Sequence, residues 1–201
     1  MRSGAIDAGE TVAWRSPVEA DAFRELRDQA ALSLAGITHL QRPLSDFWPA
    51  RGPVWDGVGV TSTGRPVFVE AKAHIAEAAS PGTRASDSSR LRITQSLEEA
   101  RRFYAPRATA SWCDVFYQYA NRLAHHYFLR EANGLPSILA FVYFTNDADM
   151  NGPSSEDEWK GAIRLLHAVL GLPHDLRGRG VYEAFVDVRN LRPAPSGEVL
   201  G

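Results

Sequence analysis

Two short apolar runs in the first half of the chain are separated by a turn rich in Ser, Thr and Gly. The runs are Val58 to Val60 and Val67 to Val69, and this pattern predicts a β-hairpin. Side chains alternate between the two faces of a strand, so Glu70 and Lys72 share one face of the second strand with Phe68. A carboxylate and an ammonium group are therefore expected side by side at the end of that strand.

The length of the hairpin loop decides whether Asp56 joins this pair. A two-residue loop would place Asp56 opposite Ala71, whose side chain points to the other face of the strand. A three-residue loop, Ser62 to Gly64, would place Asp56 opposite Glu70. Glycine takes the left-handed conformation that this loop needs at little cost. We therefore favour the three-residue loop, which predicts a cluster of Asp56, Glu70 and Lys72.

Four segments carry apolar residues at helical spacing. The first is expected to begin at Ser16, which forms a capping box with Glu19, and to end at Gly36. A second capping box, Ser155 with Glu158, marks the start of the last segment. The three later helices are expected over residues 91–104, 112–133 and 156–170.

The most apolar run, residues 137–145, predicts a strand that is buried on both faces. Residues 182–188 predict a final strand, and residues 37–40 a short one. Residues 1–15, 76–89 and 189–201 show no regular pattern and are expected to be loops or loose tails. Helices around a mixed central β-sheet predict an α/β fold, and residues 1–201 are expected to form a single domain.

Composition and charge are those of an ordinary globular protein, with 44% hydrophobic and 23% charged residues. The formal net charge of −2 gives no overall attraction to nucleic acid, so such binding would need a local basic patch. The single cysteine fits a reducing compartment. No signal-peptide core or membrane-spanning run is present in the sequence, so we expect a cytoplasmic protein without a membrane partner.

One segment does carry an excess of positive charge. Residues 82–107 contain six arginines against three acids, a local charge of +3. A loop and helix with this excess could hold a phosphate backbone, and Arg90, Arg92 and Arg101 are the candidate contacts. The alternative is a solvated helix face on which glutamates and arginines pair with one another.

The helix expected over residues 112–133 also carries a polar stripe. Its members recur at helical spacing on the side opposite the apolar residues: Gln118, Asn121, Arg122 and His125. We expect this stripe to face water, as most such stripes do. The alternatives are a groove wall that contacts substrate and a surface that meets a second copy of the chain in a homodimer.

The predicted cluster of Asp56, Glu70 and Lys72 indicates metal chemistry. Converging carboxylates repel one another unless a cation lies between them, and hard oxygen ligands suit Mg²⁺ or Mn²⁺. An acid, a hairpin and then Glu-x-Lys resembles the active site of the PD-(D/E)XK nuclease superfamily, which has the restriction-endonuclease-like fold. The superfamily core also has a similar order of helices and strands. The resemblance implies that Asp56 and Glu70 bind the metal and that Lys72 assists the attacking water.

The same resemblance adds two weaker site residues. An acid on the first helix often completes the metal site in this superfamily, and Glu19 would take that place, although its capping box is the simpler interpretation. A Gln on the helix after Glu-x-Lys contributes in some branches, and Gln95 would correspond to it. The Gln-x-x-x-Tyr pattern of the exonuclease branch is not met, because Glu99 occupies the fourth place.

The function implied is a metal-dependent nuclease that hydrolyses phosphodiester bonds of nucleic acid, with DNA as the expected substrate. The alternative is a catalytically inactive protein of the same fold that serves as a nucleic-acid-binding or protein-interaction module.

Overall fold

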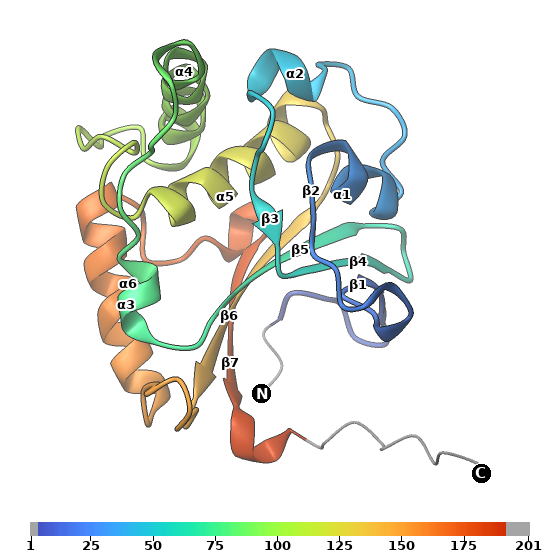
Figure 1. The fold of residues 1–201 in the computed structure, drawn as a ribbon, viewed down its shortest axis with the longest axis vertical. Coiled ribbons are helices and arrows are strands. Elements are labelled where there is room, and N and C mark those ends of the chain that lie inside the picture. The colour runs from blue at the N-terminus through green and yellow to red at the C-terminus, as the bar shows by residue number, and fades with distance from the viewer. Residues whose placement is uncertain (1–3, 192–201) are drawn as a thin grey trace.

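A mixed five-stranded sheet runs through the centre of the molecule (Figure 1), in a computed structural model that describes residues 4–191. The strands lie in the order β1-β4-β5-β6-β7. The first three pair antiparallel, and β6 and β7 continue the sheet in parallel. Their bounds are β1 Val12–Ser16, β4 Gly57–Thr61, β5 Pro66–Lys72, β6 Ile138–Thr145 and β7 Val181–Asp187. A separate ladder pairs β2, Leu26–Arg27, with β3, Val54–Trp55.

The connection from β5 to the parallel strand β6 contains three of the six α-helices in residues 4–191. It passes through α3 (Ile75–Ala78), α4 (Asp87–Tyr104) and α5 (Tyr117–Tyr127), which a π-helical turn continues over Phe128–Ala132. The remaining helices are α1 (Asp28–Leu34), α2 (Leu44–Phe47) and α6 (Glu156–Leu170). Single 3-10 turns lie at Glu19–Asp21, Arg177–Arg179 and Val188–Asn190. Within residues 4–191, no helix has both the length and the apolar character needed to cross a membrane. The predicted α/β class, a mixed sheet flanked by helices, is confirmed.

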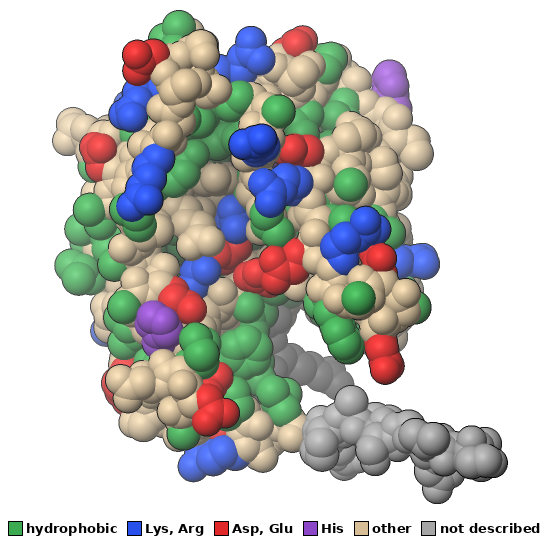
Figure 2. Space-filling model, in the orientation of Figure 1, with side chains coloured by type: hydrophobic (Ala, Val, Ile, Leu, Met, Phe, Trp, Pro, Cys, Tyr) green, Lys and Arg blue, Asp and Glu red, His purple; other side chains and the backbone are tan. Residues whose placement is uncertain are grey.

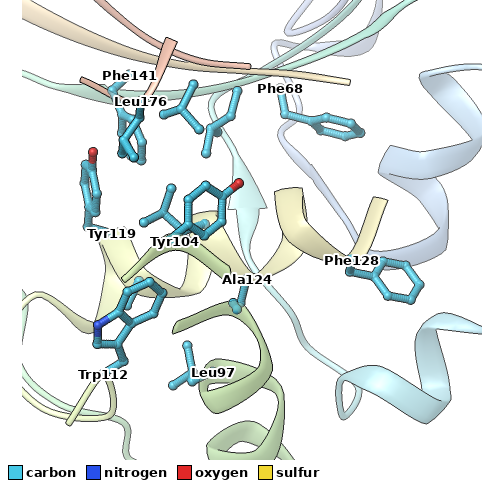
Figure 3. Packing of buried hydrophobic residues seen from close by; sticks show 14 of the residues in the cluster. Phe68, Leu97, Tyr104, Trp112, Tyr119, Ala124, Phe128, Phe141 and Leu176 are labelled. Atoms are coloured by element: carbon cyan, nitrogen blue, oxygen red, sulfur yellow. The ribbon is translucent and has the colours of Figure 1, made fainter. Parts of the chain in front are cut away.

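The main core lies between the sheet and α5. Phe68 of β5 and Phe141 of β6 lie on the side of the sheet that faces α5 (Figure 3), and Phe141 stacks on Tyr119 with ring centroids 4.1 Å apart. Leu97 and Trp112 lie on the other side of α5, where α4 packs. The helix therefore forms a middle layer between the sheet and α4.

The other face of the sheet carries a much smaller cluster of buried residues. Val67 and Val69 of β5 pack there with Ile138 of β6, and Val12 of β1 lies against them. Phe68, between these two valines, belongs to the main core. The alternation of faces predicted for β5 is therefore confirmed, and Glu70 lies on the side of the sheet that α5 covers.

The hairpin has the predicted three-residue loop. Thr61 N–H donates to Arg65 O at 2.9 Å, which leaves Ser62 to Gly64 as the loop, and Gly64 has a φ of +86°. The capping box of α6 is also confirmed, because Ser155 Oγ accepts a hydrogen bond from the Glu158 backbone N–H. The strands predicted over 137–145 and 182–188 correspond to β6 and β7.

The helix predicted from Ser16 is wrong over its first half. Residues 12–16 form strand β1, which pairs with β4, so the end of the segment expected to be loose is part of the sheet. Ala22 and Phe23 have φ values of 51° and 54°, which an α-helix does not accommodate. The helix begins only at Asp28. Pairing with the hairpin outweighs the local capping signal, because helix propensity and capping are weak terms against tertiary contacts.

Other segments also differ from the prediction. The helix expected from residue 112 begins at Tyr117, because Phe116 has a left-handed φ of 66°. The helix expected from residue 91 begins at Asp87, and α3 occupies the start of the segment expected to be a loop. Residues 37–40 form no strand. The tail expected over 189–201 lies outside the described residues from 192 onward.

Candidate active site

The hairpin brings the three predicted residues together. Asp56 immediately precedes β4, while Glu70 and Lys72 lie at the end of β5. Asp56 Oδ2 accepts a 2.6 Å hydrogen bond from the backbone N–H of Ala71, the residue between Glu70 and Lys72. The Nζ atom of Lys72 lies 2.5 Å from Glu70 Oε1. Figure 2 shows acidic and basic side chains meeting in a hollow near the middle of the molecule, where β3 and β5 lie in Figure 1.

Arg122 of α5 is a fourth member of this cluster. Its Nε atom lies 2.5 Å from Glu70 Oε2, and its Nη2 donates to Val54 O at 2.8 Å. The guanidinium group also lies over the ring of Trp55, 5.1 Å from its centroid. The side chains of Arg122 and Glu70 are only 5% and 2% exposed. They form a buried ion pair, which is costly to break from one side.

The expectation that the polar stripe of α5 faces water is therefore wrong. Asn121, Arg122 and His125 are all buried, because α5 is packed between the sheet and α4. The stripe was the only signal in the sequence that could have identified Arg122. Helical spacing showed that the polar residues share a side, but not that this side meets Glu70.

Two polar atoms of the stripe are buried without a hydrogen-bond partner among residues 4–191, Asn121 Oδ1 and His125 Nε2. His125 Nδ1 lies 3.0 Å from Asn121 O, four residues earlier in the helix, and can donate to it. Burial lowers the pKa of His125 to about 3, so the ring is neutral at pH 7. An uncharged imidazole beside Arg122 leaves the positive charge of that arginine undisturbed.

The charges of the cluster influence one another. Burial raises the pKa of Asp56, and the neighbouring charge of Glu70 raises it further. The hydrogen bond from Ala71 and the charges of Lys72 and Arg122 act in the opposite direction. Two acids and two cations balance formally, but Asp56 remains a carboxylate that is half-buried and close to a second carboxylate. Such a group favours an additional cation nearby.

The donor set of the cluster fits Mg²⁺ or Mn²⁺. Among residues 4–191, no group of three or more His, Cys, Asp and Glu side chains is placed to hold a metal ion. Mg²⁺ is commonly held by one or two carboxylates, with water and substrate phosphate as its other ligands. Asp56 and Glu70 supply such a pair, and the raised pKa of Asp56 reflects in part the repulsion that a divalent cation would relieve.

The two weaker site residues, Glu19 and Gln95, are exposed. Glu19 is exposed in a 3-10 turn, and the helix that was expected to direct it inward does not form there. Gln95 is exposed on α4, which packs on the side of α5 away from the sheet. The charged side chains that shift the pKa of Asp56 are instead Glu70, Lys72 and Arg122.

The arginines of α4 divide into two kinds. Arg101 is held internally, since Nε and Nη2 contact Glu98 at 2.7 and 2.6 Å and Nη1 donates to Ala108 O. Arg90 and Arg92 are exposed, and each reaches one backbone carbonyl, that of Thr83 or Ser45. Arg101 therefore fits the alternative in which arginines of this helix pair with glutamates. Arg90 and Arg92 keep N–H donors at the surface.

Models of known protein families, curated proteins and solved structures were compared with the chain, and none of them matches it.

Proposed function

We propose that the protein is a metal-dependent nuclease of the restriction-endonuclease-like type that hydrolyses phosphodiester bonds in DNA. The observation that carries the proposal is the meeting of Asp56, Glu70 and Lys72 at the open end of a hairpin. The order of elements also supports it, because a hairpin followed through helices by a parallel strand is similar to the core of that superfamily.

Each member of the cluster has a role in this proposal. Asp56 and Glu70 would hold Mg²⁺ or Mn²⁺, which when bound supplies a Lewis acid for the phosphoryl oxygen and a water of lowered pKa. Lys72 has a side chain that is 13% exposed, and it would orient that water or neutralise charge growing on the phosphate. The exposed arginines of α4, Arg90 and Arg92, would contact the phosphate backbone.

One observation favours a second candidate function. Both carboxylate oxygens of Glu70 are engaged, Oε1 by Lys72 and Oε2 by Arg122, so the cluster is also complete as a buried ion network. In that case the chain would be a non-catalytic protein that binds nucleic acid or another protein, and the cluster would serve the fold alone.

Single-turnover cleavage of duplex, branched and single-stranded DNA, with Mg²⁺ and with Mn²⁺, tests the proposal. Wild type should cut at least one of these substrates, and Glu70→Gln should lose cleavage. Glu99→Gln is the matched control, because Glu99 is also paired with an arginine, Arg42 at 2.6 Å, but lies outside the cluster. Cleavage by Glu70→Gln at the wild-type rate would rule out the proposal, and no cleavage by wild type would favour the binding module.

A further inference from the structure

Arg122 contacts the strands that lead to both candidate metal ligands. Its Nε atom holds Glu70 Oε2 at the end of β5. Its Nη2 atom holds the carbonyl of Val54 in β3, two residues before Asp56. The ring of Trp55, between Val54 and Asp56, lies beneath the same guanidinium group. A single side chain from α5 thus connects the segment that carries one acid to the side chain of the other.

We propose that Arg122 is a positioning residue that sets the separation of Asp56 and Glu70 for metal binding. This inference rests on the nuclease function proposed above. A guanidinium group is planar and directs its donors at fixed angles, so two bonds from one fork fix the distance between their acceptors. With Arg122 buried and held at three points, the Glu70 carboxylate and the Val54 carbonyl cannot move apart independently.

The two cationic side chains beside Glu70 differ in how easily they can move away from it. Lys72 is a single charge on a flexible stem and touches Oε1, and its side chain is the more exposed of the two. It can turn away when Oε1 takes another partner. Arg122 keeps Oε2 throughout, because leaving it would strand a buried carboxylate. Glu70 would therefore offer only Oε1 to a metal, and Asp56 would supply the second carboxylate.

Arg122→Lys tests the inference while keeping the positive charge. A lysine has one donor group and cannot bridge Glu70 and Val54 as a fork does. We expect the affinity for Mn²⁺, measured by calorimetry without DNA, to fall about 10- to 100-fold, the scale seen when a partner of a metal ligand is removed. The kcat for cleavage should fall while the KM for DNA stays near the wild-type value, because Arg122 does not contact substrate.

Arg42→Lys is the matched control. Arg42 pairs with Glu99 through two nitrogens, at 2.6 and 3.2 Å, and lies 5.1 Å from the ring centroid of Phe47. The substitution therefore also removes a two-nitrogen guanidinium contact beside an aromatic ring, but one made to a single carboxylate. Mn²⁺ affinity and kcat should remain at wild-type values in this variant.

Chemical rescue distinguishes the effect of the guanidinium geometry of Arg122 from the effect of its positive charge. Arg122→Ala should regain Mn²⁺ affinity when ethylguanidinium is added, but not with ethylammonium, which has the same charge and no fork. If Arg122→Ala does not fold, the Arg122→Lys measurements decide the matter alone.

The outcomes distinguish this inference from the nuclease proposal. Wild-type Mn²⁺ affinity and kcat in Arg122→Lys would overturn the positioning role and leave the nuclease function standing. A wild type that binds Mn²⁺ but cuts no DNA would overturn the nuclease function, while a weakened Mn²⁺ affinity in Arg122→Lys would still support the positioning role. A wild type that does not bind Mn²⁺ would overturn both.

Discussion

The backbone N–H of Ala71 donates a 2.6 Å hydrogen bond to the side chain of Asp56. Ala71 lies between Glu70 and Lys72, so this bond connects the start of β4 to the end of β5 at the point where the acids meet. It depends on the pairing of Gly57 with Val69, which the three-residue loop establishes. A shorter loop would shift this pairing and direct Asp56 to the other face of the sheet.

The first prediction concerns metal binding. Mn²⁺ or Mg²⁺ should raise the melting temperature of wild type, because a ligand that binds only the folded state stabilises it, by about 2.7 kcal/mol at a hundred times its Kd. Asp56→Asn and Glu70→Gln should lose this response, and Asp157→Asn, a change at an exposed acid of α6, should keep it. Thermal unfolding with and without metal measures the effect. If Asp56→Asn and Glu70→Gln respond as wild type does, the metal binds elsewhere.

The second prediction concerns acid stability and the neutral ring of His126. Its Nδ1 atom lies 2.7 Å from the hydroxyl oxygen of Tyr104, and its Nε2 atom lies 3.0 Å from Ser137 O. Burial lowers its pKa to about 4 from an ordinary value of 6.5. Between these two pH values the unfolded chain binds a proton that the folded protein does not, so the free energy of unfolding should fall as the pH falls.

The free energy of unfolding that the neutral His126 ring loses on acidification reaches roughly 3 kcal/mol once the ring is protonated in the folded protein. His126→Gln should be less stable than wild type at pH 7, but its free energy of unfolding should fall less steeply from pH 6.5 to 4. His125 and His167, whose pKa values are also lowered by burial, to about 3 and about 4, add to the slope in both proteins. Glu183, with a pKa raised by burial, partly opposes it. Urea unfolding at several pH values measures the free energy of unfolding of both proteins. Identical slopes against pH would contradict the lowered pKa of His126.

The third prediction concerns DNA binding by α4. Arg90→Ala and Arg92→Ala should weaken binding and reduce the slope of log affinity against log salt by about 0.9 for each phosphate that is no longer neutralised. Arg101→Ala should leave the slope unchanged, because Glu98 and Ala108 already hold that guanidinium group. Fluorescence anisotropy over a range of salt concentrations gives the slopes. Unchanged slopes for Arg90→Ala and Arg92→Ala would show that these arginines of α4 do not contact DNA phosphates.

Local patterns in the sequence were sufficient to predict the hairpin, its loop and three of the four cluster members. Gly64 and the alternation along β5 contain that information within about 17 residues. The helix α6 was equally accessible, because its capping box lies at its own first turn. These features depend on contacts between residues that are near one another in the chain.

Features that depend on distant contacts were missed. Arg122 is 52 residues from Glu70, and the helical spacing of its stripe does not show which element covers it. The strand β1 exists because β4 offers a free edge, whereas its own sequence contains a capping signal for a helix. Both errors arise where long-range packing outweighs a local preference.

Substitution of Lys72 distinguishes a role in catalysis from a role in substrate binding. Its Nζ atom lies 2.5 Å from Glu70 Oε1, where it could stabilise charge that grows in the transition state or simply hold the phosphate of the bound substrate. Only the first role accelerates the chemical step. Since an ammonium group is no metal ligand, Lys72→Ala should still bind Mn²⁺, and its affinity for DNA should fall only modestly.

The most direct measurement is therefore the single-turnover rate of DNA cleavage by wild type and Lys72→Ala, at saturating Mg²⁺ or Mn²⁺. We predict that the rate falls about 100-fold or more, the usual scale for loss of one such electrostatic or acid–base group. Lys160→Ala, which removes a lysine paired with Glu156 at 3.1 Å on α6, should cut at the wild-type rate. Cleavage by Lys72→Ala as fast as by wild type would contradict the nuclease mechanism.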